Sequence, residues 1–370
     1  MRILTVNAGS SSLKFSLIGH QDETIAEHEL PAPQARIDPA ELARVLAGPL
    51  ADADAVAHRI VHGGERFREA VRIDSAVTDE LHRLTDLAPL HQPKSLAALD
   101  AVSARLPSLP AVACFDTAFH STLPAAAFTY ALPARWRERW GLRRFGFHGL
   151  SHSWVARRAP ELLDGGPTIG RLVSCHLGAG ASLCAIVDGR SQDTTMGFTP
   201  LEGLVMATRS GSVDPGMLLW LLEREAISER EMAEALEHES GLAGLAGSAD
   251  MQAVLAAAER HEPAAVLAID VYLHHLRAGI AAMASALGGL DGLVFTGGVG
   301  EHSSQIRARA ADGLGFLGVQ IDPVGNRGGA VDAEITADGA PVRTLVLRAR
   351  EDLEMARQAA AVLARSDSAA

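Results

Sequence analysis

The chain has 370 residues with 48% apolar content, and its formal net charge is -12 at pH 7. A single hydrophobic core stops growing at about 250 to 300 residues, so two domains are expected. The negative charge argues against nucleic acid or an anionic membrane as the main partner, because both require a basic face.

The chain opens with a strand, a small polar turn and a second strand. An apolar strand at 3–6 is followed by the turn Asn7-Ala8-Gly9-Ser10-Ser11-Ser12 and by a second strand at 13–18 that contains Lys14. Backbone N–H groups, hydroxyls and a lysine at one turn suit the binding of phosphate groups. The alternative is a β-hairpin with a serine-rich turn.

The remainder of the first half alternates between strands and helices. Strands are predicted at 55–61 and 111–115, and helices at 77–87 and 93–105, where proline fits the first helical turn. After Asp116 the chain becomes richer in glycine and in long helices. We therefore predict an α/β first domain that ends near residue 117.

Two more glycine turns follow in the second half. A strand at 172–175, the turn 176–182 and a strand at 183–187 repeat the opening design, which suggests two related domains facing a shared cleft. The third turn, 296–301, follows an apolar strand at 292–295 and precedes a helix predicted to begin near Ser303. Three such turns favour phosphate chemistry over simple hairpins.

Long helices are predicted for most of the second half, at 151–159, 215–238, 250–260 and 263–287. The longest carries Asp270, His274, His275 and Arg277, and we predict it to be too polar to span a membrane. A last helix at about 352–364 is expected to pack on the first domain. The predicted domains are therefore 1–117 with about 353–370, and 118–352.

The three cysteines are expected to be buried free thiols. Cys114, Cys175 and Cys184 lie in apolar runs and show no CxxC spacing. The chain opens without the basic and apolar segments of a signal peptide. A cytoplasmic location is therefore predicted.

Two arginines and an aspartate are the first candidates for chemistry. Arg59 is followed by Ile-Val-His-Gly-Gly and Arg209 lies in Thr-Arg-Ser-Gly, places where a guanidinium can hold a carboxylate or phosphate as a fork. A structural ion pair is the alternative for both. Asp116 follows an apolar strand, so it is predicted either at the carboxyl edge of a sheet, where α/β ligands bind, or as a helix cap.

Several histidines are spaced four residues apart, as zinc ligands on a helix can be. His58/His62 and His148/His152 show this spacing, but the intervening Ile60-Val61 and the neighbouring glycines disfavour a helix. Zinc is therefore not the preferred interpretation. The remaining histidines, among them His120, His152, His274 and His275, are interpreted as ordinary hydrogen-bonded residues.

Taken together, these clusters resemble the acetate kinase family of the acetate and sugar kinase/Hsp70/actin superfamily. The matching motifs occur in the same order over nearly the whole chain: Asn7–Lys14, His58–Glu65, Leu90–His91, Phe115–His120, Gly146–His152, His176–Ser182, Asp193–Asp214 and Phe295–Glu301. The resemblance implies an α/β, two-domain actin-like fold built from duplicated ribonuclease H-like domains with an interdomain cleft. It also implies reversible transfer of a phosphoryl group between ATP and acetate, with Mg²⁺ or Mn²⁺, and a homodimer formed through the C-terminal domain.

The resemblance also assigns roles to individual residues. Arg59 and Arg209 would hold the carboxylate and the transferred phosphoryl group, His148 would hydrogen-bond that group, and Asp116 would be the essential acidic residue. Asn7 and Glu351 would position the metal through its water shell. The acyl pocket would comprise Val61, Leu90, Phe147 and Pro200. The nucleotide and phosphate contacts would be Ser10, Ser12, Lys14, His176, Leu177, Gly178, Ala179, Gly180, Asp250, Met251, Gln252, Gly298, Val299, Gly300, Glu301 and His302.

The chain departs from the family pattern mainly around the nucleotide. Ala179 and His302 replace asparagines that the family usually has, and Gln252 replaces an arginine. Ser212 replaces an aspartate, and the segment 18–54 is shorter than usual. We hypothesise that the acyl half-reaction is retained while nucleotide affinity or base selectivity is relaxed. A sharper variant has pyrophosphate as the phosphoryl donor.

Other functions remain open at this point. Propionate or butyrate kinase activity depends on the size of the acyl pocket, where one methylene is worth only ~1 to 3 kcal/mol. Val61 keeps the predicted pocket small and favours acetate. A non-catalytic sensor of nucleotide or acyl phosphate is a further alternative, but Arg59, Asp116, His148 and Arg209 are all retained.

Overall fold

The computed structural model describes residues 1–9, 12–31, 37–87, 92–163, 169–224, 227–329 and 331–368. The chain forms two compact units. Unit 1 comprises Met1–Ser121, Phe147–Trp154 and Arg350–Ala370, and unit 2 comprises Thr122–Gly146 and Val155–Ala349. The sequence placed 147–154 in the second domain, whereas these residues belong to unit 1. Their backbone is bonded there, because Gly149 N donates to Asp116 O at 2.9 Å.

Unit 1 is built on a six-stranded mixed sheet of order β3-β2-β1-β4-β6-β5. The strands are β1 (Ile3–Ala8), β2 (Ser12–Ile18), β3 (Thr24–Pro31), β4 (Ala55–Ile60), β5 (Val71–Arg72) and β6 (Ala111–Phe115). β1, β4 and β6 are parallel, while β2, β3 and β5 run antiparallel to their neighbours. The carboxyl ends of β1, β4 and β6 therefore meet at one edge, which is where ligands bind in α/β sheets.

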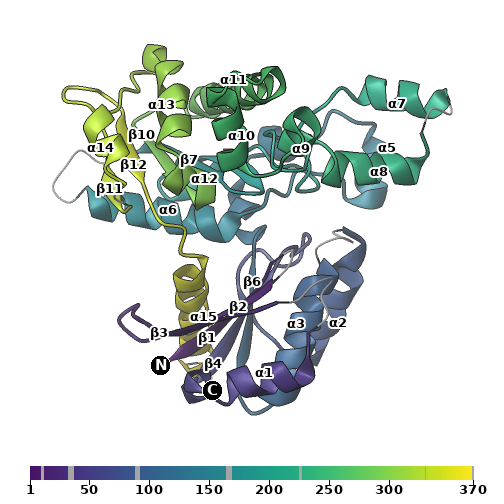
Figure 1. Ribbon diagram of the computed structural model, residues 1–370. Coiled ribbons are helices and arrows are strands. Elements are labelled where there is room, and N and C mark those ends of the chain that lie inside the picture. The colour runs from purple at the N-terminus through teal and green to yellow at the C-terminus, as the bar shows by residue number, and fades with distance from the viewer. Residues whose placement is uncertain are drawn as a thin grey trace. The chain divides into compact units, whose positions relative to one another are not determined.

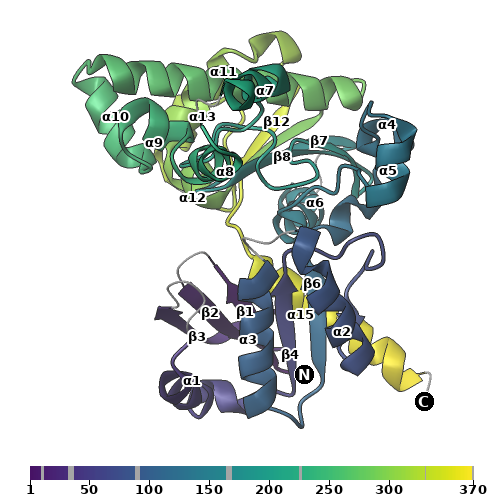
Figure 2. The same cartoon turned by 90° about the vertical axis from the view of Figure 1, so that its right-hand side faces the viewer.

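Helices cover both faces of this sheet. They are α1 (Pro39–Leu46), α2 (Ser75–Arg83), α3 (Gln92–Arg105) and α15 (Glu351–Ser368), with 3-10 turns at Pro49–Asp52, Leu84–Leu87 and Ala118–Thr122. Leu42 of α1 and Val102 of α3 pack on Leu4 and Val6 of β1. α15 contacts β1, β4 and β6, and Figure 2 shows it on the face opposite α3. The last helix of the chain thus completes the first sheet's second face.

Unit 2 repeats this topology. Its sheet has the order β11-β12-β10-β7-β8-β9, with β7, β10 and β12 parallel and the other three antiparallel. The strands are β7 (Arg171–Leu177), β8 (Ala181–Val187), β9 (Arg190–Thr194), β10 (Gly292–Thr296), β11 (Ala333–Glu334) and β12 (Arg343–Val346). In each unit the first three strands form an antiparallel meander, the fourth and sixth strands run parallel to the first, and the fifth is a short antiparallel strand at the far edge.

The helices of unit 2 surround its sheet (Figure 1). They are α4 (Ala125–Phe128), α5 (Ala134–Trp140), most of α6 (Gly149–Leu162), α7 (Pro215–Glu223), α8 (Glu229–His238), α9 (Gly241–Ala246), α10 (Met251–Glu259), α11 (Pro263–Ala286), α12 (Gly297–His302), α13 (Ser304–Asp312) and α14 (Pro323–Arg327), with a 3-10 turn at Gly315–Leu317. α11 packs on β7, β8 and β9 and on the neighbouring helices α9, α10 and α13.

α11 is more apolar than we predicted from the sequence. By length and composition it is apolar enough to cross a membrane, with a mean hydropathy of 1.2 over its best window, of which 39% is buried. Its buried side chains include Ile269, Leu273, Leu276 and Ile280. These residues lie in the core of unit 2, so packing accounts for the buried part of the apolar surface of α11.

Two boundaries predicted from the sequence need correction. The helix predicted at 215–238 is two helices, because α8 starts afresh at Ser228, whose side chain forms a capping box with Glu231. The turn predicted at 296–301 is itself the short helix α12, which starts at Gly297, and α13 begins at Ser304. A capping side chain decides the start of α8, whereas Thr296 makes no side-chain capping bond at the start of α12.

Candidate functional site

A buried ion pair lies at the carboxyl edge of the unit 1 sheet. Arg59 is in β4 and Asp116 follows β6, the neighbouring parallel strand. Arg59 Nε lies 3.0 Å from Asp116 Oδ1, and its Nη2 lies 2.6 Å from Oδ2. Only 17% of the Arg59 side chain and 2% of the Asp116 side chain are exposed. Burial alone would lower the pKa of Arg59, but Asp116 and Glu351 outweigh it, so the net pKa is raised.

Asn7 and Glu351 extend this pair into a network. Arg59 Nη1 donates to Asn7 Oδ1 at 3.0 Å, and Asn7 Nδ2 donates to Glu351 Oε2 at 3.2 Å. Asn7 lies near the end of β1 and Glu351 is the first residue of α15. The structure thus joins four residues from β1, β4, the end of β6 and α15, all of which were predicted site residues.

Phe147 and His148 lie against the same edge. Gly149 N donates to Asp116 O, and a Cβ on Gly149 would lie only 2.1 Å from that oxygen, so the close approach requires glycine. His120 Nε2 lies 3.0 Å from Phe147 O, and the His62 ring meets the Phe147 ring edge-on at 5.6 Å. His148 adopts a left-handed φ of 56°, which places a partly exposed imidazole directly after buried Phe147.

The opening turn lies between β1 and β2, and its predicted phosphate contacts stay a prediction. Lys14 is the register partner of Asn7, so the two side chains lie on one face of the sheet. Its ammonium is exposed and 3.9 Å from Glu29. Gly9 N donates to Ser12 O at 2.8 Å, which closes the turn. Ser10 and Leu90 lie outside the described residues, while Val61 and Phe147 of the predicted acyl pocket are both buried.

Arg209 and Pro200 lie together in unit 2. Arg209 Nε is 3.2 Å from Glu237 Oε2, and its Nη1 donates to Pro200 O at 3.3 Å. Burial lowers the pKa of Arg209, and Glu237 counteracts only part of this effect. Glu237 belongs to α8 and carries no local sequence signal that would have identified it as this partner.

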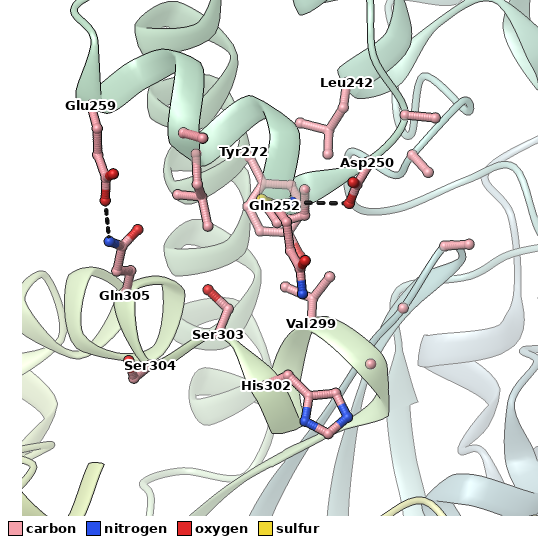
Figure 3. Close-up of a pocket in the computed structure, with 18 residues that line it drawn as sticks. Leu242, Asp250, Gln252, Glu259, Tyr272, Val299, His302, Ser303, Ser304 and Gln305 are labelled. Carbon is pink, nitrogen blue, oxygen red and sulfur yellow. Dashed lines mark hydrogen bonds between the residues drawn. The ribbon is translucent and has the colours of Figure 1, made fainter. Parts of the chain in front are cut away.

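A pocket of about 600 Å³ in unit 2 gathers three predicted nucleotide segments. The predicted residues that line it are Gly178, Ala179, Asp250, Met251, Gln252, Gly298, Val299 and His302. Sequence reasoning missed further lining residues, among them Leu242, Glu259, Tyr272, Ser303, Ser304 and Gln305. Figure 3 shows the Gln252 amide directed toward α12, which carries Val299 and His302. Segments more than 120 residues apart in the chain therefore build one cavity.

One lining residue, Asp250, also caps a helix, and the remaining predicted nucleotide residues lie next to the lining in the sequence. Asp250 lines the pocket but its carboxylate also caps α10, accepting from Gln252 N at 3.0 Å. Glu301 instead accepts from Gly297 N at 3.0 Å and from Ala349 N at 2.9 Å. Leu177 is fully buried at the end of β7, next to His176. Gly180 closes the turn by accepting from Gly178 N at 2.9 Å, and Gly300 is buried in α12.

The edge at Arg59 and Asp116 carries oxygen atoms that could hold a divalent metal. Among the described residues no group of three or more His, Cys, Asp or Glu side chains forms a metal site. Asn7, Asp116 and Glu351 nevertheless offer the hard oxygen donors that Mg²⁺ prefers, and Mg²⁺ keeps several waters and binds substrate phosphates besides one or two carboxylates. The donor set therefore fits a metal held through water and substrate rather than by a closed protein cage.

Comparison with known proteins gives consistent results. Residues 40–357 match the model of the Acetokinase family. An acetate kinase from Gloeobacter violaceus is 48% identical over 317 residues, 85% of this chain and 78% of that protein. The crystal structure of Porphyromonas gingivalis acetate kinase has a TM-score of 0.88 at 33% identity, covering 98% of this chain and 99% of the other. A propionate kinase from Francisella tularensis has a TM-score of 0.89 at 32% identity, covering 96% and 98%.

Proposed function

This chain belongs to the acetokinase family, and we propose that it transfers the γ-phosphoryl group of ATP reversibly to acetate, giving acetyl phosphate and ADP. The family's enzymes are phosphotransferases with a carboxyl group as acceptor, and the two-domain actin-like α/β fold is confirmed by the solved relatives. The observation that carries the proposal is the network of Asn7, Arg59, Asp116 and Glu351 at the carboxyl edge of one sheet.

The chemistry asks the protein for positioning and charge rather than for covalent catalysis. A carboxylate oxygen of acetate attacks the γ-phosphorus, the bond from that phosphorus to the bridging oxygen breaks, and ADP leaves with the electron pair. Negative charge then spreads over the equatorial oxygens, where an arginine can contribute ~10³ to 10⁵ in rate. In our proposal Arg59 and Arg209 hold the carboxylate and the phosphoryl group, and His148 hydrogen-bonds the latter.

Asp116 acts through Arg59 in this scheme. Its two carboxylate oxygens hold the guanidinium as a fork, which fixes the direction of the remaining N–H groups. Asn7 and Glu351 are proposed to hold Mg²⁺ through its water shell. The ion would neutralise phosphate charge when bound. Lys14 and Ser12 are proposed to serve the phosphates from β2.

The pocket of unit 2 is proposed to bind the nucleotide. Its lining joins the glycine turn at 178–179, the start of α10 and α12. Amide and hydroxyl groups from Gln252, Ser303 and Gln305 can each donate or accept, which supports our hypothesis of relaxed base selectivity. A strong preference for adenine over guanine nucleotides would contradict that hypothesis.

Acetate is preferred as acceptor, and propionate is the second candidate. Val61 and Phe147, two residues of the proposed acyl pocket, are apolar and buried. Propionate remains a candidate acceptor because a solved propionate kinase is similar to this chain. One methylene in an apolar pocket changes the free energy of binding by only ~1 to 3 kcal/mol, so we expect a preference for acetate and not a complete exclusion of propionate.

Acyl phosphate formation, trapped as hydroxamate, tests the proposal. Acetate, propionate and butyrate are each supplied with MgATP, MgGTP or magnesium pyrophosphate. We expect the highest kcat/KM with acetate and a nucleotide. Turnover that requires pyrophosphate would identify pyrophosphate as the donor in place of ATP. A higher kcat/KM with propionate would identify propionate as the preferred acceptor. Binding of nucleotide without any turnover would indicate a sensor.

We also propose that two copies of this chain associate through α7. This helix has no buried residue, and Met217, Leu219 and Trp220 are 46%, 59% and 51% exposed. Several large apolar side chains exposed on one helix are typical of an interaction site. A second copy is the proposed occupant, because α7 can then pair with itself about a two-fold axis.

A further inference from the structure

Helix α12 separates the nucleotide pocket from a buried arginine. Gly298, Val299 and His302 line the pocket. The carbonyls of Gly300 and Glu301 instead accept hydrogen bonds from Arg307 Nη1, each at 2.8 Å. The residues of one short helix are thus divided between a ligand-facing side and a side held by Arg307, which lies in the following helix α13.

Arg307 is held by four neutral acceptors. Besides the two α12 carbonyls, its Nε donates to Asn326 Oδ1 at 2.7 Å and its Nη2 donates to Asn326 O at 2.9 Å. Asn326 is fixed in turn, because its Nδ2 donates to Ser304 O at 2.9 Å. Arg307 is 2% exposed and Asn326 is 3% exposed. Burial lowers the pKa of Arg307, and none of its four acceptors is a carboxylate.

A buried guanidinium without a carboxylate partner is costly, since desolvation is not offset by a charge pair. The planar guanidinium of arginine can nevertheless hold several carbonyls in a fixed geometry, whereas the donors of a lysine ammonium rotate. The first residue of α12 is tied to a contact outside the helix, because Glu301 Oε1 accepts both from Gly297 N at 3.0 Å and from Ala349 N at 2.9 Å. Gly297 itself has a φ of 78°, and a Cβ there would lie 2.9 Å from Leu177 O. The position of α12 is thus determined from both ends.

We infer that Arg307, together with Asn326, is a positioning residue for nucleotide binding. It acts through α12, by holding the Gly300 and Glu301 carbonyls so that Gly298, Val299 and His302 keep their places in the pocket wall. The inference rests on the proposed function, because it takes the pocket as the nucleotide site. It assigns no contact between Arg307 and the nucleotide.

The test compares Arg307→Met with Arg309→Met. Arg309 is a matched control, because it lies in the same helix but its side chain is 42% exposed and pairs with Asp270. Loss of hydrogen bonds to a buried charged group predicts a rise of roughly tenfold or more in the KM for ATP of Arg307→Met. The KM for acetate at saturating ATP should change less than about twofold, and Arg309→Met should behave as the wild type.

Several outcomes would overturn the inference. They are an unchanged KM for ATP in Arg307→Met, an equal rise in the KM values for ATP and acetate, or a lower kcat with both KM values unchanged. If Arg307→Met does not fold, Asn326→Ala carries the same test, because it retains the arginine and removes one acceptor. A rise in its KM for ATP supports the inference, and no rise contradicts it.

Calorimetric titration with MgADP separates this inference from the proposed function. If the wild type binds MgADP but makes no acyl phosphate, the proposed function fails, while the ratio of variant to wild-type Kd still tests Arg307. A wild type that binds no nucleotide contradicts both. A weaker Kd confined to Arg307→Met and Asn326→Ala supports the positioning role.

Discussion

The pairing of Arg59 with Asp116 accounts for much of the candidate chemistry at the scale of single residues. Both side chains are largely withdrawn from solvent, and the carboxylate engages two nitrogens of the guanidinium. Arginine is suited to this geometry because its planar fork matches a carboxylate. A local sequence pattern can name such residues, but it cannot distinguish a catalytic arginine from a structural ion pair.

Replacing Asp116 by asparagine tests whether the pair orients Arg59. The amide keeps the volume but removes the charge and one acceptor oxygen, so Arg59 loses its fixed direction. We expect kcat to fall by about 10² to 10³ while circular dichroism shows a folded protein. Wild-type kcat in Asp116→Asn would make the pair purely structural.

Buried histidines predict acid sensitivity. His58 is 1% exposed, neither of its ring nitrogens has a hydrogen-bond partner among the described residues, and burial lowers its pKa from 6.5 to about 4. Burial also lowers the pKa of His62 to about 4. In the unfolded chain these imidazoles bind protons at a higher pH than in the folded protein. The contribution of these two histidines to the free energy of unfolding is therefore fully present above about pH 6.5 and is lost as the pH falls toward 4.

His58→Leu should reduce this acid sensitivity. For a pKa shift from 6.5 to about 4, the histidine contributes about 3 kcal/mol to the loss of unfolding free energy. Urea unfolding of His58→Leu at pH 7 and pH 4.5 should show a smaller difference than in the wild type, with His62 still contributing. His20→Leu is the control, because that side chain is 70% exposed. An unchanged pH difference in His58→Leu would contradict the assignment.

At the scale of elements, the start of α6 links the predicted catalytic histidine to the sheet. Gly149 begins the helix directly after His148, and its backbone N–H is bonded to Asp116 O. The glycine allows the helix to approach Asp116 more closely than any side chain would permit. The orientation of His148 therefore depends on the contact between α6 and the end of β6.

Gly149→Ala should disturb both stability and activity. The added Cβ would lie 2.1 Å from Asp116 O and 3.0 Å from Phe119 Cβ. Overpacking of this kind costs about 1 to 3 kcal/mol, and the shift of His148 should lower kcat as well. Gly315→Ala is the control, because nothing lies within 4 Å of the Cβ position there. Equal urea midpoints and equal kcat for both variants would show that α6 can move without consequence.

For the whole molecule, the two sheets share one topology although their sequences differ. Each combines an antiparallel meander with parallel strands, and each places its site residues at or after the carboxyl ends of parallel strands. α7 is apolar but has no buried residue. Its composition is explained if a second copy covers it.

Charge placed on α7 should therefore dissociate the proposed dimer. In sedimentation velocity we expect the wild type to run as a dimer and Leu219→Glu/Trp220→Glu as a monomer, because a carboxylate cannot be buried in an apolar interface without a partner. Phe316→Glu, at a side chain that is 76% exposed but outside α7, should remain dimeric. A monomeric wild type, or a dimer in the α7 variant, would refute the proposal.

Some structural features could have been predicted more fully from the sequence. The capping box of Ser228 and Glu231 is a readable start signal, and it would have divided the helix predicted at 215–238. β3 was missed because most of Thr24–Pro31 is exposed, so no apolar alternation marks it. The α15 boundaries and β6 were close to prediction, because their apolar patterns are strong.

The sequence by itself determined the family, the fold class and the apolar strands that precede each glycine turn, because these depend on local periodicity and on motifs of adjacent residues. Only the tertiary structure decided which residues meet. Asn7 bonds Glu351 across 344 positions, and Arg209, which lies outside any helix, pairs with Glu237 of α8. Strand order and helix packing determine such partners, because they bring together residues that are distant in the sequence. The local sequence around each residue does not indicate the contact.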